Sequence, residues 1–379
     1  MSRPSGDPSR RYGASPVYPT CLYGAPERSI GSSRWLSSLR PWEPDPSVGT
    51  PGRFGDVAGR LETAFTMLVG CRAPIQLAVM GGGTGTPELA AAVSEAGGLG
   101  MISSTFPLPI NEQLSWVDAR TVEPVGVGFF AFDLPRRTNE LELAAAHARV
   151  VDVFWGDPDP VVVNRIHTGG ALAFWQVGSL DEALSAADAG CDVVVAQGVE
   201  AGGHLRGTTP LRTLLAQVVP AVAVPVVAAG GIATGEALAA VLNAGAAGAR
   251  VGTRFLASAE SGAHPEYVAA LLAATAEDTV RTTAYAQGWS DAPHRVLRAA
   301  TDRAARANDV VGHAAYRDRR WEIARWSTQP PTVFTTGDVT AMAMYAGCGV
   351  GDINDVTSAA RIVDRLMDDA LPLLSQATP

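Results

Sequence analysis

The chain has 379 residues, 47% of them hydrophobic, and a formal net charge of −9 at pH 7. This length allows a large buried core, and the acidic balance argues against a nucleic-acid-binding surface. The sequence contains no lysine, which excludes lysine Schiff-base chemistry and a Walker-type phosphate lysine.

The first 60 residues are rich in proline, serine, glycine and arginine, and "RPWEPDPSVGTPGRFG" has neither a helical nor a strand period. We expect residues 1–60 to form an irregular or disordered extension. An over-long reading frame is the alternative, because "LETAFTMLVGCRAPIQLAVM" resembles a natural domain opening. The N-terminus has no signal-peptide core, and no apolar run is long enough to span a bilayer. We therefore expect a cytoplasmic protein without a membrane partner.

Residues 61–254 alternate short apolar runs with alanine-rich helical stretches such as "TPELAAAVSEAGG" and "TGEALAAVLNAGAAG". Continuous Val/Ala runs are typical of parallel strands covered on both faces. The count favours a (β/α)8 TIM barrel over its competitor, an open doubly wound sheet. The eight expected strands are Ile75–Val79, Leu99–Ser103, Val125–Phe130, Val150–Trp155, Ala171–Gln176, Asp192–Ala196, Val224–Ala228 and Ala249–Val251.

After residue 254 the strand rhythm stops. "HPEYVAALLAATAED" and "VTSAARIVDRLMDDALPLL" have helical patterns, and the arginine-rich stretch between them is expected to be mostly helical. We interpret 255–379 as a helical appendage packed on the catalytic end of the barrel. Given the acidic total, its arginines are interpreted as a solvated face.

Two glycine-containing pairs follow the last two predicted barrel strands. Gly230-Gly231 follows the seventh strand, and Gly252-Thr253 follows the eighth and opens a short helix. Backbone N–H groups there favour an anion, and glycine lets a phosphate approach closely. Barrels commonly hold phosphate at these two loops. Arg254 could clamp the same phosphate, but a structural ion pair is the favoured interpretation.

The stretch "VVVAQGVEAGGHLRGTTP" begins as the sixth strand and ends in glycines. Gln197 could offer an amide to a planar ligand, and Gly202 and Gly203 permit close backbone contact. His204 is the candidate catalytic residue, because an imidazole can exchange a proton near neutral pH. Gln176 and Met80 remain open between a ligand contact and core packing. The remaining histidines are interpreted as structural residues on helices or helix ends: His147, His167, His264, His294 and His313.

Four longer motifs resemble the nitronate monooxygenase family, formerly called 2-nitropropane dioxygenases: "PIQLAVMGGGTGTPELAAAVSEAGGLGMIS", "VVVAQGVEAGGHLRG", "VPVVAAGGIATGEALAAVLNAGAAGARVGTRFLASAESGAHPEY" and "MYAGCGVGDINDVTSAARIVDRL". The resemblance implies an FMN-binding barrel that oxidises alkyl nitronates with oxygen to a carbonyl compound and nitrite. It implies His204 as the catalytic residue and places Tyr345 near the site. The FMN-contacting positions that it implies are Ala78, Val79, Met80, Gly128, Gln197, Gly202, Gly231, Arg250, Val251, Gly252 and Thr253.

Two positions depart from the family pattern. Gly128 stands where the family often has asparagine, and Arg250 stands where glutamine is common, which would put a positive charge near the flavin. The motifs also resemble the FMN- and NAD(P)H-dependent enoyl-acyl carrier protein reductases, so this activity is the alternative. A flavin-binding module without turnover is a third reading. The resemblance implies a small-molecule substrate and oxygen as partners. We expect no metal site, and a homo-oligomer remains open.

The four cysteines also favour a cytoplasmic location. They stand far apart without metal-ligand spacing, which predicts free thiols in a reducing cytosol. They are Cys21, Cys71, Cys191 and Cys348.

Overall fold

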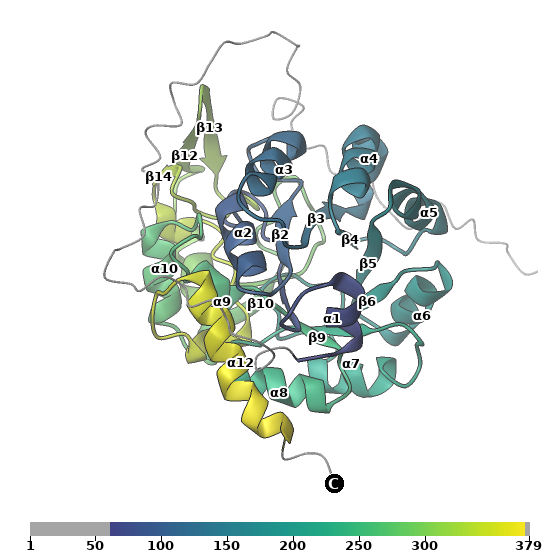
Figure 1. Ribbon diagram of the computed structural model, residues 1–379. Coiled ribbons are helices and arrows are strands. Elements are labelled where there is room, and N and C mark those ends of the chain that lie inside the picture. The colour runs from purple at the N-terminus through teal and green to yellow at the C-terminus, as the bar shows by residue number, and fades with distance from the viewer. Residues whose placement is uncertain (1–60, 376–379) are drawn as a thin grey trace, which may run out of the picture.

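The computed structural model describes residues 61–375; the expected N-terminal extension, residues 1–60, lies outside this range. Within it, eight parallel strands form the central sheet in the order β1-β9-β8-β6-β5-β4-β3-β2 (Figure 1). Their bounds are β1 Ile75–Leu77, β2 Gly100–Ser103, β3 Val125–Phe130, β4 Val150–Phe154, β5 Leu172–Val177, β6 Val193–Gln197, β8 Val226–Ala229 and β9 Gly248–Val251.

The sheet closes on itself between β1 and β2. Leu77 N–H donates to the Leu99 carbonyl and Leu99 N–H donates to the Ile75 carbonyl, while Gln76 and Leu99 form a parallel bridge. Closure leaves no sheet edge unpaired. The predicted (β/α)8 barrel is therefore confirmed.

Helices follow the barrel strands and cover their outer faces. Thr86 caps α2 by accepting from Leu89 N–H, and Ser179 caps α6 by accepting from Glu182 N–H, as their sequence positions predict. The bounds are α2 Pro87–Glu95, α3 Ile110–Asp118, α4 Thr138–His147, α5 Pro160–Gly169, α6 Leu180–Asp188, α7 Leu211–Val218 and α8 Gly235–Asn243.

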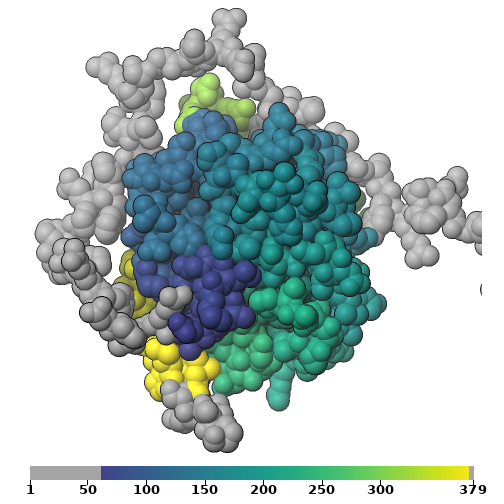
Figure 2. Space-filling model, turned by 45° about the vertical axis from the view of Figure 1, so that its right-hand side comes forward, coloured from purple at the N-terminus to yellow at the C-terminus, as the bar shows by residue number. Residues whose placement is uncertain are grey.

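The amino-terminal end of the barrel is closed by α1, Ala64–Val69. Phe65 is fully buried, and its ring centroid lies 6.3 Å from that of Phe174. Figure 2 shows this purple segment among the blue and green surfaces of the surrounding barrel. A plug at this end leaves the opposite end, where the strands finish, as the open mouth.

The two helical patterns predicted after residue 254 are confirmed by α10 and α12, but the expectation that the stretch between them is mostly helical is wrong. This stretch contributes β10 to β14 to two three-stranded sheets, with strand orders β10-β11-β7 and β13-β12-β14, and β7 comes from the loop after β6. These strands are short and contain alanine and arginine, and their stability comes from cross-strand packing more than from intrinsic preference. The bounds are β7 Gly203–His204, β10 Thr279–Thr282, β11 His294–Leu297, β12 Val310–Tyr316, β13 Arg319–Ala324 and β14 Thr335–Gly337; the helices are α9 Thr253–Leu256, α10 Pro265–Leu272, α11 Arg298–Ala304 and α12 Ala359–Ser375.

The last helix, α12, packs on the side of the barrel. It lies against α8 and α2 (Figure 1), and Ile362, Val363 and Leu366 join the barrel's core cluster. A Cβ at Gly235 on α8 would meet Asp369 Cβ at 2.4 Å, which shows how close the two helices lie. The segment between α9 and α12 is thus an insertion in the eighth strand–helix unit. In the described range, no helix is long and apolar enough to cross a membrane.

Candidate active site

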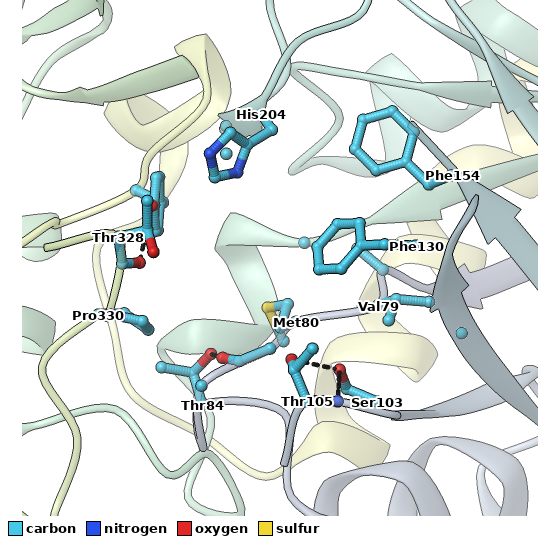
Figure 3. A pocket seen from close by; sticks show the side chains of 18 of the residues that line it. Val79, Met80, Thr84, Ser103, Thr105, Phe130, Phe154, His204, Thr328 and Pro330 are labelled. Atoms are coloured by element: carbon cyan, nitrogen blue, oxygen red, sulfur yellow. Dashed lines mark hydrogen bonds between the residues drawn. The ribbon is translucent and has the colours of Figure 1, made fainter. Parts of the chain in front are cut away.

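A cavity of about 590 Å³ opens at the carboxyl ends of the barrel strands. Its walls come from the loops after the strands and from the inserted segment, including β13 and the turn around Tyr345. Figure 3 shows Met80 and Val79 below this space, Phe130 and Phe154 on its right, and His204 at its upper left, across from Phe154. The volume is in the range of small-molecule and cofactor sites.

The glycine loops after β8 and β9 lie together on one wall of the cavity. Gly230 and Gly231 have φ values of 126° and 70°, which favour glycine, and Gly252 approaches Ala78 so closely that a Cβ there would lie 3.2 Å from it. Within residues 61–375, the N–H groups of Gly231 and Gly252 donate to no protein acceptor. The Thr253 hydroxyl accepts from Gly347 N–H at 3.0 Å. This wall, called here the glycine cradle (Gly230, Gly231, Gly252 and Thr253), offers free backbone donors to an anion.

The loop after β1 forms a neighbouring wall. Ala78, Val79 and Met80 all line the cavity. Gly128 also lines it, and a Cβ at this position would lie 2.4 Å from both Val79 methyl carbons. The departure to glycine at 128 therefore has a steric reason, since the side chain of Val79 occupies the space that a side chain at 128 would need.

Arg250 lies on the cavity floor, inside the barrel, and is 5% exposed. Its guanidinium donates to Asp152 Oδ1 at 2.5 Å, to Gln76 Oε1 at 3.2 Å and to Gln176 Oε1. These partners come from β4, β1 and β5, so one side chain crosses the barrel lumen. The sequence left Gln176 open between a ligand contact and core packing. In the structure its side-chain carbonyl accepts from Arg250, and the residue also lines the cavity.

The charge of Arg250 is balanced within the barrel. Asp152 is 1% exposed, and burial raises its pKa above the usual value while the Arg250 guanidinium opposes that shift. The expected positive charge near a ligand is therefore one half of a buried ion pair. Val251, in contrast, is 1% exposed in the barrel wall and does not line the cavity.

Gln197 positions the histidine loop. Its Nε2 donates to the His204 carbonyl at 2.9 Å, and its Oε1 accepts from Arg206 N–H at 3.2 Å. The amide that the sequence suggested for a ligand is thus engaged by the protein backbone. Gly202 is also a packing residue, because a Cβ there would lie 2.6 Å from Gly347 N.

His204 lines the cavity and is enclosed by aromatic rings. Its centroid lies 3.9 Å from that of Trp289, nearly parallel at 20°, and 5.9 and 5.6 Å from those of Trp155 and Tyr345. Its Nε2 is buried and has no hydrogen-bond partner within residues 61–375. The residue as a whole is half-buried and lines the cavity. Burial, followed by repulsion from His294, holds the pKa of His204 well below its usual value, so the imidazole is neutral at pH 7.

Apart from Tyr345, which the family resemblance placed near the site, the sequence patterns missed the rings around His204. Trp289 has Phe130 and Trp155 edge-on at 4.7 and 5.0 Å, and Phe154 lies edge-on to Trp155 at 5.5 Å. Trp155 has a φ of 62°, a left-handed backbone that costs a non-glycine residue about 1–3 kcal/mol. The one available signal was position, since Phe130 and Trp155 end their predicted strands and Phe154 directly precedes Trp155.

Other sequence assignments have mixed outcomes. Arg254 pairs with Asp355 Oδ1 at 2.7 Å, so the structural ion pair is confirmed. His264 caps α10 by accepting from Glu266 N–H, which confirms a structural role. The helical placement of His294 is wrong: it lies on β11, directly opposite His204 in the β7–β11 pairing. His313 lies on β12.

A glycine cradle and a neutral histidine facing one cavity at the mouth of a (β/α)8 barrel define an enzyme site at the position where such barrels carry out their chemistry. A family model described as nitronate monooxygenase matches residues 62–140 and 136–369. The chain therefore belongs to the nitronate monooxygenase family of oxidoreductases, and the resemblance read from its motifs is confirmed.

The curated relatives of this chain are named for different activities. A protein of Rhodococcus jostii, named as a (3aS,4S,5R,7aS)-5-hydroxy-7a-methyl-1-oxo-octahydro-1H-indene-4-carboxyl-CoA dehydrogenase, is 29% identical over 82% of this chain and 96% of its own length. A probable nitronate monooxygenase of Staphylococcus saprophyticus is 31% identical over 59% of this chain and 76% of its own.

Two solved structures cover 83% of the chain at 29% identity. They are a mutant of FabK from Thermotoga maritima, with a TM-score of 0.69 over 98% of that chain, and the nitroalkane oxidase of Streptomyces ansochromogenes, with a TM-score of 0.66 over all of it. Both similarities support the barrel fold.

Proposed function

We propose that this protein is an FMN-dependent oxidoreductase that oxidises alkyl nitronates, or their parent nitroalkanes, with dioxygen to a carbonyl compound and nitrite. The observation that carries the proposal is the placement of a neutral His204 and the glycine cradle on the same cavity. The nitroalkane oxidase of Streptomyces ansochromogenes, similar over all of its length, supports this substrate class.

The residues that line the cavity fit a flavin mononucleotide. The free N–H groups of Gly231 and Gly252 suit its phosphate, and the apolar loop Ala78–Met80 suits the flat face of its ring system. A side chain on Gly231 would strain the φ of 70° and approach Glu200 at 3.2 Å. When bound, FMN would supply a two-electron acceptor that dioxygen reoxidises.

His204 would handle the proton of the substrate. A neutral imidazole has one nitrogen that accepts and one that donates, so it can take the proton from the carbon next to a nitro group. Its donor nitrogen can also hydrogen-bond to the oxygen of a nitronate anion. The rings of Trp289 and Tyr345 beside it exclude water from the same space.

A second candidate is the dehydrogenation of a bulky acyl thioester. Half-buried aromatic rings line much of the cavity away from the glycine cradle, which suits a large apolar substrate. They are Phe130, Phe154, Tyr316, Trp321 and Tyr345. The Rhodococcus jostii relative, whose name gives a bicyclic carboxyl-CoA substrate, matches almost throughout its length. The carbon next to a thioester carbonyl is also a carbon acid that a neutral His204 could deprotonate.

One anaerobic titration separates these activities. The purified protein is expected to show the absorption bands of bound flavin, and the bands should bleach when an alkyl nitronate is added without oxygen. Bleaching by NADPH instead would favour the enoyl-reductase alternative, and bleaching only by a bulky acyl-CoA would favour the thioester candidate. A colourless protein that refuses added FMN would contradict all three.

A further inference from the structure

Trp289 covers one face of the proposed catalytic imidazole. It lies in the loop between β10 and β11, and the residue is 4% exposed. Its centroid stacks 3.9 Å from that of His204, while Phe130 and Trp155 contact it edge-on. Phe132 is a fourth ring in contact with the indole, at 5.0 Å. The indole is thus packed among four rings, so any shift of its loop changes the surroundings of His204.

His294 fixes this loop on both sides of Trp289. One of its ring nitrogens, Nδ1, lies 2.9 Å from the Ala292 carbonyl, and the other, Nε2, lies 3.3 Å from Tyr285 N. A carbonyl oxygen can only accept, so Nδ1 carries the hydrogen and Nε2 accepts from the Tyr285 N–H. The side chain is fully buried. A single imidazole thus ties residue 285 to residue 292.

A proton relay between the two histidines does not fit these contacts. Both nitrogens of His294 are engaged by the backbone, and its centroid lies 5.3 Å from that of His204, with the rings inclined at 62°. Protonation of His294 would also remove the acceptor that Tyr285 N–H uses. The contacts therefore favour a role in placing the loop.

We propose that His294 is a positioning residue, which holds the 285–292 loop so that Trp289 packs on His204 and fixes its imidazole in one orientation toward the cavity. The consequence for turnover rests on the proposed function of His204, whereas the packing itself does not. Other attachments of the two strands support this design: the Arg295 guanidinium donates to the Val199 carbonyl at 2.7 Å, and Leu205 N–H donates to the Pro293 carbonyl at 2.7 Å.

The direct test is the reactivity of His204 toward diethyl pyrocarbonate, followed by peptide mass spectrometry of the protein as purified. Trp289→Ala and His294→Ala should each raise the modification rate of His204 by about tenfold, because the covering ring is removed or released. The matched controls, Trp116→Ala on α3 and His313→Ala on β12, should leave the rate unchanged. An unchanged rate in both test variants would overturn the proposal, and a rise with Trp289→Ala alone would overturn the role of His294.

Conservative variants keep the test decisive if the alanine variants fold poorly. Trp289→Phe retains a stacking ring, and His294→Asn retains a donor near the Nδ1 position, so both should bring the rate back toward wild type. For turnover of a neutral nitroalkane, His294→Ala should lower kcat more than it raises KM. A faster modification rate in a protein inert to nitronates would support the positioning role while contradicting the proposed function.

Discussion

The two sides of the cavity are built by opposite means. On the barrel side, the groups that suit an anion belong to the backbone: Gly231 and Gly252 present N–H groups, and Arg250 keeps its charge for Asp152. On the cover side, large rings from the inserted segment and the strand ends close around His204. The barrel side thus suits a fixed anionic cofactor, whereas the cover suits a variable apolar substrate and keeps His204, the proposed base, neutral.

The largest effect should come from the cover side. His204→Asn should lower kcat/KM for a neutral nitroalkane by about 10²–10⁴-fold, the usual worth of a general base, while FMN stays bound. Because burial lowers the pKa of His204, its neutral form persists as the pH falls through 6.5. The acid limb of the wild-type kcat/KM profile should therefore lie below pH 6.5. A variant with full activity on the neutral nitroalkane would refute the base assignment.

The two sides also differ in how well the sequence predicts them. The expected strand Val125–Phe130 has the bounds of β3, because barrel strands are continuous apolar runs between capped helices. His204 stood out because it follows the sixth strand within a glycine-rich loop. Trp289 and His294 did not, since their roles arise only when β11 pairs with β7, far away in the chain.

Arg250 shows the same limit within the barrel. The family resemblance implied a ligand contact for Arg250, which lies in the eighth predicted strand, and the residue does line the cavity floor. Its partners Asp152 and Gln176 lie on β4 and β5, which only closure of the barrel brings across the lumen. Patterns of neighbouring residues in a sequence do not indicate which side chains meet across the lumen of a closed barrel.

The barrel side can be tested through this ion pair. Arg250→Met should destabilise the protein by about 3–5 kcal/mol, because it leaves the buried carboxylate of Asp152 without a partner. Adding Asp152→Asn should recover much of that loss, since the unpaired charge is removed. Urea unfolding midpoints measure both changes. Arg165→Met, which breaks the exposed Arg165–Glu142 pair, is the control and should cost under about 1 kcal/mol. If Arg250→Met and Arg165→Met lower the free energy of unfolding equally, Arg250 and Asp152 do not form a buried ion pair in solution.

A smaller change tests whether the glycine cradle holds the cofactor. Gly231 and Gly170 both have positive φ values, 70° and 97°, so replacement by alanine should cost each a similar backbone strain of about 1 kcal/mol. They differ in place: Gly231 lines the cavity, whereas Gly170 ends α5 with open space where a Cβ would lie. Gly231→Ala should weaken FMN binding by about tenfold, since the strain shifts a backbone donor, and Gly170→Ala should not change it. Quenching of FMN fluorescence on reconstitution measures both affinities. If the two variants bind FMN with equal affinity, the phosphate binds elsewhere. The barrel side would then not be the cofactor-binding side of the cavity.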